Sequence, residues 1–171
     1  MEHTLALQKI MNAWFTDISQ SQDIKGYCTE HFHKKPKYIV GGNPRESPSE
    51  EDCPFIVVMN DNKLEGEGLD TYTYSAVIVW AISNTAMIVD GTEQPFGGYP
   101  EADTITLKGA VEVDELGQLI YEVVAKCAID HGYPLSKVEY DLSPKASFPQ
   151  FVGYMRIETE IEPTMGEILD Y

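Results

Sequence analysis

The sequence predicts an α+β fold, in which an antiparallel or mixed β-sheet carries two main helices. Two segments show helical apolar spacing, several β-rich segments lie between and after them, and no strand–helix–strand alternation repeats. The 171 residues suit a single domain with a sizeable core. Within residues 1–171 we expect an N-terminal helix with an edge or loop segment (1–52), an α+β core (53–163) and a C-terminal tail (164–171).

Both helices are predicted from apolar residues that recur every three or four positions. The first covers residues 4–20. The second carries its apolar stripe over Leu116–Cys127, begins at or just before Asp114, and stops at Gly132. His131 falls in its last turn, where a histidine favours the negative end of the helix dipole, so we interpret it as structural.

The strands are predicted from β-branched or alternating segments. The longest, Tyr72–Ser83, becomes apolar on both faces near Trp80, so its second half should be covered on both sides. The other expected strands cover 54–59, 137–142 and 151–162, with a short helix or strand at 86–89 and one or two strands between Ile24 and Ile39.

The charge balance excludes several classes of protein. The 28 acidic and 12 basic residues give a net charge of −16. A nucleic-acid-binding surface needs the opposite sign, and an acidic membrane surface would repel this chain. Residues 51–171 hold 22 acidic and six basic residues, and therefore the whole excess.

The cysteines and the apolar segments indicate a cytoplasmic protein with reduced thiols. Three cysteines are an odd number, and they lack the paired spacing of disulfide scaffolds and zinc ribbons. Cys127 lies on an apolar stripe, where a thiol is mostly an inert packing group. The first residues do not resemble a signal peptide, and the longest apolar stretch, Ala76–Ile82, is far shorter than a membrane span.

The sequence offers one weak candidate for a metal site and no catalytic motif, so we expect no catalytic residue and no cofactor. On a strand, His31 and His33 would share a face, and Cys28 could curl toward them. No fourth ligand is evident, and three lysines follow directly. A polar edge segment is therefore favoured, although a small intracellular enzyme or metal-binding protein using these residues stays a hypothesis.

Three carboxylates are predicted to form an acidic row on one face of the last strand. Glu158, Glu160 and Glu162 alternate with other residues, so their side chains point the same way and repel one another. The simpler interpretation is a solvated sheet face. The alternative is a channel wall along which a polyanion slides without sticking. A third hypothesis makes the chain an acidic binding module for a basic protein partner.

The order of the segments resembles the tail-terminator family of phages and prophages, which includes minor tail proteins of Mu-like and lambda-like phages. The resemblance covers roughly residues 53–163. It rests on a leading amphipathic helix followed by Pro54–Val58, Tyr72–Ser83, a Gly-rich loop, Leu116–Cys127, Val138–Leu142, and Phe148–Gly153 leading into an alternating strand.

The resemblance implies a phage tail protein-like fold and a structural role without catalysis or cofactor. Subunits would form a hexameric ring that caps the tail tube and meets the head connector, with DNA passing through without specific binding. The chain would reside in the bacterial cytoplasm during assembly, and in the virion tail if the phage is active. Three expected loops (41–52, 60–70 and 90–103) could supply subunit contacts, with Phe96 and Tyr99 as candidate anchors.

Overall fold

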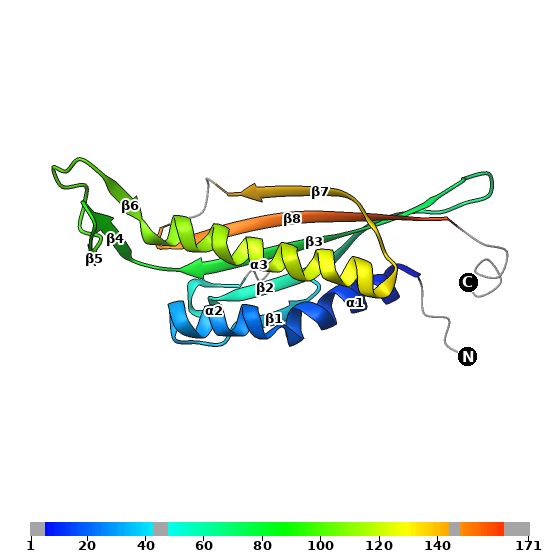
Figure 1. Cartoon of the computed structure of the whole chain (residues 1–171), viewed down its shortest axis with the longest axis horizontal. Helices are drawn as coiled ribbons and strands as arrows, with labels where there is room; N and C mark the ends of the chain where they lie inside the picture. Colours follow the sequence, from blue (N-terminus) through cyan, green and yellow to red (C-terminus); the bar gives the residue numbers. More distant parts are fainter. Residues whose placement is uncertain (1–5, 43–47, 144–147, 163–171) are drawn as a thin grey trace.

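The computed structural model describes residues 6–42, 48–143 and 148–162. The predicted tail, 164–171, lies outside the described residues. Within them, a five-stranded sheet carries helices on one face, and a smaller three-stranded sheet projects at one end (Figure 1). The predicted α+β class is therefore confirmed.

The elements follow one another along the chain without a repeated unit. The helices are α1 (Ala6–Gln20), α2 (Gln22–Phe32) and α3 (Lys108–His131), with a short 3-10 turn η1 at Glu50–Asp52. The strands are β1 (Lys37–Val40), β2 (Phe55–Leu64), β3 (Tyr72–Ser83), β4 (Ala86–Val89), β5 (Thr92–Pro95), β6 (Ile105–Leu107), β7 (Leu135–Leu142) and β8 (Gln150–Ile161).

The large sheet is mixed, in the order β1-β2-β3-β8-β7. β1 runs parallel to β2, while β2–β3, β3–β8 and β8–β7 are antiparallel pairs. The two twelve-residue strands β3 and β8 pair over their full length, from Tyr72 opposite Ile161 to Ser83 opposite Gln150. They therefore form the centre of the sheet on which the helices pack.

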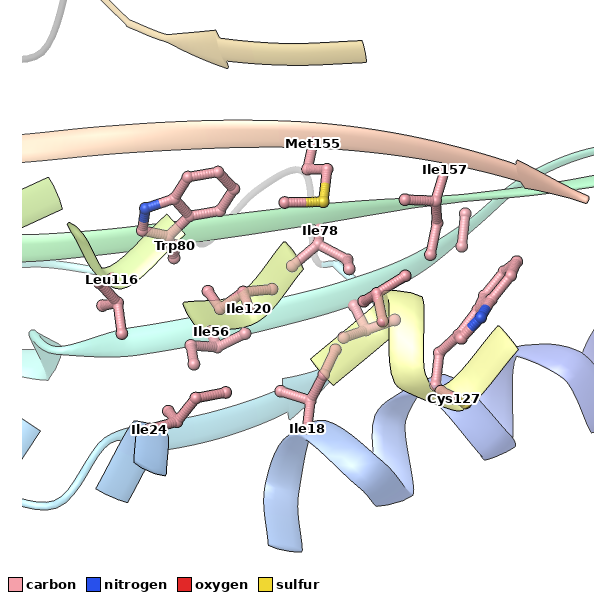
Figure 2. Packing of buried hydrophobic residues seen from close by; sticks show 14 of the residues in the cluster. Ile18, Ile24, Ile56, Ile78, Trp80, Leu116, Ile120, Cys127, Met155 and Ile157 are labelled. Carbon is pink, nitrogen blue, oxygen red and sulfur yellow. The ribbon is translucent and has the colours of Figure 1, made fainter. Parts of the chain in front are cut away.

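The main core lies between this sheet and the helices. Trp14 and Ile18 of α1, Ile24 of α2, and Leu116 and Ile120 of α3 are fully buried. They meet the inward-facing residues of the central strands, as Figure 2 shows for Ile56, Ile78, Trp80, Met155 and Ile157. Trp80 is anchored because its indole Nε1 donates a hydrogen bond to the carbonyl oxygen of Val113 at 2.8 Å.

A second apolar cluster lies on the opposite face of the sheet. It consists of Cys53, Phe55, Val57 and Ala81, with other residues packed around it. Ala81 is fully buried there, while its neighbour Trp80 is fully buried on the helix side. The prediction that the second half of the long strand is buried on both faces is therefore confirmed.

A helix occupies part of the segment in which strands were expected. Residues 22–32 form α2, so only the last part of Ile24–Ile39 is extended, as β1. The Ser21 hydroxyl caps α2 by accepting a hydrogen bond from the Ile24 amide at 3.3 Å. Gly26 and Tyr27 lower the helix propensity, but burial of Ile24 and Cys28, four positions apart, overrides it.

Other boundaries also differ from the sequence prediction. α3 begins at Lys108, six residues before Asp114, because its first turns bury Gly109 and Val113 against the sheet. β2 continues to Leu64 as an exposed ladder with β3, which shortens the loop expected at 60–70. The expected loop at 90–103 contains β5, and residues 86–89 are a strand, β4.

The small sheet forms an arm, defined here as residues 84–107, that extends from the end of β3. Its strand order is β5-β4-β6, and all pairs are antiparallel. Asp90 and Gly91 join β4 to β5 with φ angles of 46° and 84°, as a tight hairpin turn requires. Figure 1 shows the arm at the opposite end of the molecule from the β2–β3 connection.

Candidate functional site

The three residues proposed as metal ligands do not share a strand face. Cys28 is fully buried in the core, where burial raises the pKa of its thiol to about 12. His33 ends α2 in the left-handed conformation, with a φ of 55°, and its side chain is exposed. His31 points elsewhere, toward α3. Sequence reasoning placed these residues on a strand, whereas Cys28 and His31 lie on α2 and His33 is its C-cap.

His31 instead contacts the carboxylate of a buried acid, Glu112. Its Nδ1 lies 2.8 Å from Oε2 of Glu112, whose side chain is only 3% exposed. The ring of Tyr27 stacks on the imidazole, with centroids 4.0 Å apart and planes 19° apart. The amide nitrogen of Asn84 donates a hydrogen bond to the other carboxylate oxygen of Glu112. This network joins α2, α3 and the turn between β3 and β4.

Glu112 was missed because its partners are far away in the sequence. His31 is 81 residues distant and Asn84 is 28 residues distant. One signal was available, since Glu112 lies four residues before Leu116 on the stripe of α3 that faces the core. An acid on an apolar stripe needs a buried partner, and sequence alone does not say which residue provides it.

A shallow pocket of about 330 Å³ lies beside this pair. Of the two histidines that line it, only His31 belongs to the buried network. The nearby Cys53 thiol has its pKa raised by burial, which disfavours the reactive thiolate. In the described residues, no three potential metal ligands cluster here. The lining residues are His31, Phe32, His33, Cys53, Pro54, Ser83, Asn84 and Thr85.

The two predicted interface residues lie next to each other on the arm. The rings of Phe96 and Tyr99 pack edge to face, with centroids 5.2 Å apart. Phe148 joins them at 4.9 Å from Phe96, and Phe151 contacts Phe148 at 6.2 Å. Tyr99 is 71% exposed and Phe148 is 42% exposed. We call these four side chains the aromatic patch. Sequence reasoning did not include Phe148 and Phe151, because they reach the patch from β8 and the residues just before it.

The arm, which carries Phe96 and Tyr99 of the aromatic patch, is held by bonds within it and by one contact with α3. The Phe96 amide donates to the Thr85 carbonyl oxygen at 2.9 Å, which fixes the start of the patch. The Asp90 carboxylate accepts a hydrogen bond from the Thr104 amide at 2.9 Å. Lys108 at the start of α3 contacts Glu93 of β5 at 3.1 Å. The aromatic patch is therefore presented on a structured support.

The acidic row is only partly solvated. Glu158 and Glu160 pair with Ser75 and Thr73 of β3, on the sheet face away from the helices. Glu160 and Glu162 are exposed, with Glu162 just beyond the end of β8. Glu158 is 18% exposed, and its carboxylate lies 3.2 Å from the guanidinium of Arg156. The negative charge of Glu158 is therefore balanced by a neighbouring cation.

Arg156 also neutralises an acid on β2. Its Nε lies 2.7 Å from Oδ2 of Asp61, and the Ser75 hydroxyl donates to the same oxygen at 2.8 Å. These two donors hold the pKa of Asp61 below its usual value. The far face of the sheet thus carries a compensated cluster around Arg156, and Glu160 and Glu162 toward the end of β8 are exposed to solvent.

The chain matches no protein-family model, and no curated protein matches its sequence. In the described part of the chain, no helix combines the length and the apolar character that crossing a membrane requires. The chain's most distinctive surface feature is the aromatic patch.

Proposed function

We propose that this chain is a structural protein of a phage or prophage tail, a tail terminator or tail-completion subunit that caps the tail tube and joins it to the head connector. The observation that carries the proposal is the aromatic patch on the arm. Tyr99 and Phe148 expose 71% and 42% of their surface next to two further aromatic rings. Large exposed aromatic side chains in one cluster are typical of protein–protein interfaces.

A ring assembly needs two different surfaces that fit each other on neighbouring subunits. The aromatic patch supplies one of them at the end of the molecule where the arm projects (Figure 1). Because hydrophobic contact dominates binding at such anchors, removing one ring should weaken assembly more than removing an isolated surface residue. Homo-oligomerisation, with six subunits in the ring, is part of this proposal.

The net charge of −16 is compatible with a ring through which DNA passes. Strong DNA binding depends on the release of counterions by lysine and arginine, and a strongly acidic subunit offers little of this. The exposed Glu160 and Glu162 are the candidates for a surface that DNA slides past. The enzyme and metal-binding hypothesis based on Cys28, His31 and His33 stays a prediction, as does the acidic binding module.

Electron microscopy of tails tests this function in the phage or lysogen that carries the gene. Without the gene, tails should be over-long or lack heads, and the wild-type gene should restore normal particles. With the Tyr99→Ala gene, the number of head-joined tails should be at least about tenfold lower than with the wild-type gene, because the variant lacks a central anchor of the contact.

Tyr121→Ala is the matched control, because Tyr121 is an exposed tyrosine on α3 with 37% of its surface accessible. It should restore particles as well as the wild type does. Normal particles in the absence of the gene contradict the tail function. Normal particles with Tyr99→Ala contradict the role of the aromatic patch.

A further inference from the structure

Three side chains that could bind a metal ion meet where α1 packs on α3. They are Asp17 of α1 and Cys127 and His131 of α3, and their ligand atoms all lie within 4.8 Å of one another. His131 Nε2 is 3.3 Å from Oδ2 of Asp17. Figure 2 shows Cys127 at the end of the core where α3 lies close to α1. In the described part of the chain, this is the one group of three such side chains with this proximity.

The fold explains why the three atoms converge. Cys127 and His131 are four residues apart on α3, so their side chains project from the same face of the helix. Asp17 lies on α1, which packs directly against α3. Cys127 is fully buried, whereas the side chains of Asp17 and His131 are 30% and 43% exposed. The group is therefore closed toward the core and open toward solvent.

The chemistry of these three groups favours one kind of ion. Sulfur, imidazole nitrogen and carboxylate oxygen together suit Zn²⁺, whereas Mg²⁺ and Ca²⁺ prefer oxygen ligands alone. A tetrahedral zinc ion with bonds of about 2.0 to 2.3 Å separates its ligand atoms by roughly 3.5 Å. The present separations, at most 4.8 Å, need only small side-chain rotations to reach that value.

We propose that Asp17, Cys127 and His131 bind a single Zn²⁺ ion, with a water molecule at the fourth position on the solvent side. Binding releases the thiol proton of Cys127 to solvent, and the thiolate and the carboxylate then balance the two charges of the ion. The ion would link α1 to α3 across more than one hundred residues of chain. The site is independent of the proposed tail function.

Titration of the untagged full-length protein with Co²⁺ and Zn²⁺ tests the site. Co²⁺ should give a thiolate-to-cobalt charge-transfer band and the intense visible absorption of tetrahedral cobalt, both saturating at about one ion per chain. Zn²⁺ should displace the cobalt and raise the unfolding temperature, because it binds the folded state. Absence of saturable binding, or of the charge-transfer band, overturns the proposal.

Variants show whether these residues hold the ion. His131→Gln and Asp17→Asn change partly exposed side chains, so both variants should stay folded. Each should weaken Zn²⁺ binding by at least about tenfold, because loss of an outer-shell partner alone already costs that much. Cys127→Ser should abolish the charge-transfer band. His33→Gln, at the exposed histidine just after α2, is the control and should bind as the wild type does. Unchanged affinity in both His131→Gln and Asp17→Asn contradicts the site.

Discussion

Replacing Gly153 with alanine is expected to lower the free energy of unfolding by about 3 kcal/mol, the upper part of the usual range for overpacking a core. Gly153 sits on β8 directly opposite Trp80 of β3. A Cβ atom at this position would clash with the indole ring. The ring has little freedom to move away, because its Nε1 donates a hydrogen bond to the Val113 carbonyl oxygen of α3 at 2.8 Å.

Gly26→Ala is the matched control for this substitution. Gly26 lies inside α2, and a Cβ there would have no heavy atom within 4 Å. Alanine should therefore stabilise the protein by up to about 1 kcal/mol through helix propensity. Urea denaturation followed by circular dichroism measures both variants, and Gly153→Ala with wild-type stability would contradict the packing described for Trp80.

Replacing His31 with asparagine is expected to lower the free energy of unfolding by about 2 kcal/mol. The change removes the imidazole whose Nδ1 lies 2.8 Å from the Glu112 carboxylate, and it removes the stacking of Tyr27 on that ring. Glu112, with its side chain only 3% exposed, then keeps Asn84 as its remaining side-chain donor. A buried carboxylate with too few donors carries a desolvation penalty of about 1 to 3 kcal/mol.

His33→Asn provides the comparison for His31→Asn. His33 is exposed and has a φ of 55°, a conformation that asparagine adopts readily. The free energy of unfolding of His33→Asn should stay within about 0.5 kcal/mol of the wild-type value, as for most surface substitutions. The two variants are compared in the same urea titrations at pH 7. Equal stabilities for the two would show that the pair with Glu112 contributes nothing to the fold.

The parts of the fold with a strong period were predictable from the sequence. The alternation along β3 and the apolar residues on both of its faces near Trp80 predicted a strand whose second half is covered on both sides, and Trp80 and Ala81 are both fully buried. The Leu116–Cys127 stripe of α3 and its end at Gly132 also follow from local sequence. These signals are strong because each long element buries a continuous run of apolar residues.

The N-terminal segment was harder to predict because its local preferences conflict with its tertiary contacts. Gly26, Tyr27 and Phe32 read as strand or loop residues, yet the segment is helical where Ile24 and Cys28 enter the core. Ser21 was a usable capping signal at its start. The early beginning of α3 was missed for a related reason. Gly109 has a low helix propensity, but it lies in the first turn of α3 because the ring of Phe151 packs against it and leaves no room for a Cβ.

The candidate sites depend on contacts that no local pattern encodes. Phe96 and Tyr99 were found because they are aromatic residues in a Gly/Pro-rich segment, but Phe148 comes from another part of the chain. The four-residue spacing of Cys127 and His131 is visible in the sequence, whereas Asp17 is brought to them only by the packing of α1 on α3.

The most direct test of the proposed function is complementation in vitro. Purified protein is added to an extract of cells that make heads and tails but lack this gene, and head-joined tails are counted by electron microscopy. A subunit that completes the tail should restore joined particles in proportion to the amount added until every tail is capped. A count that stays at the level of the untreated extract at saturating protein would contradict the account.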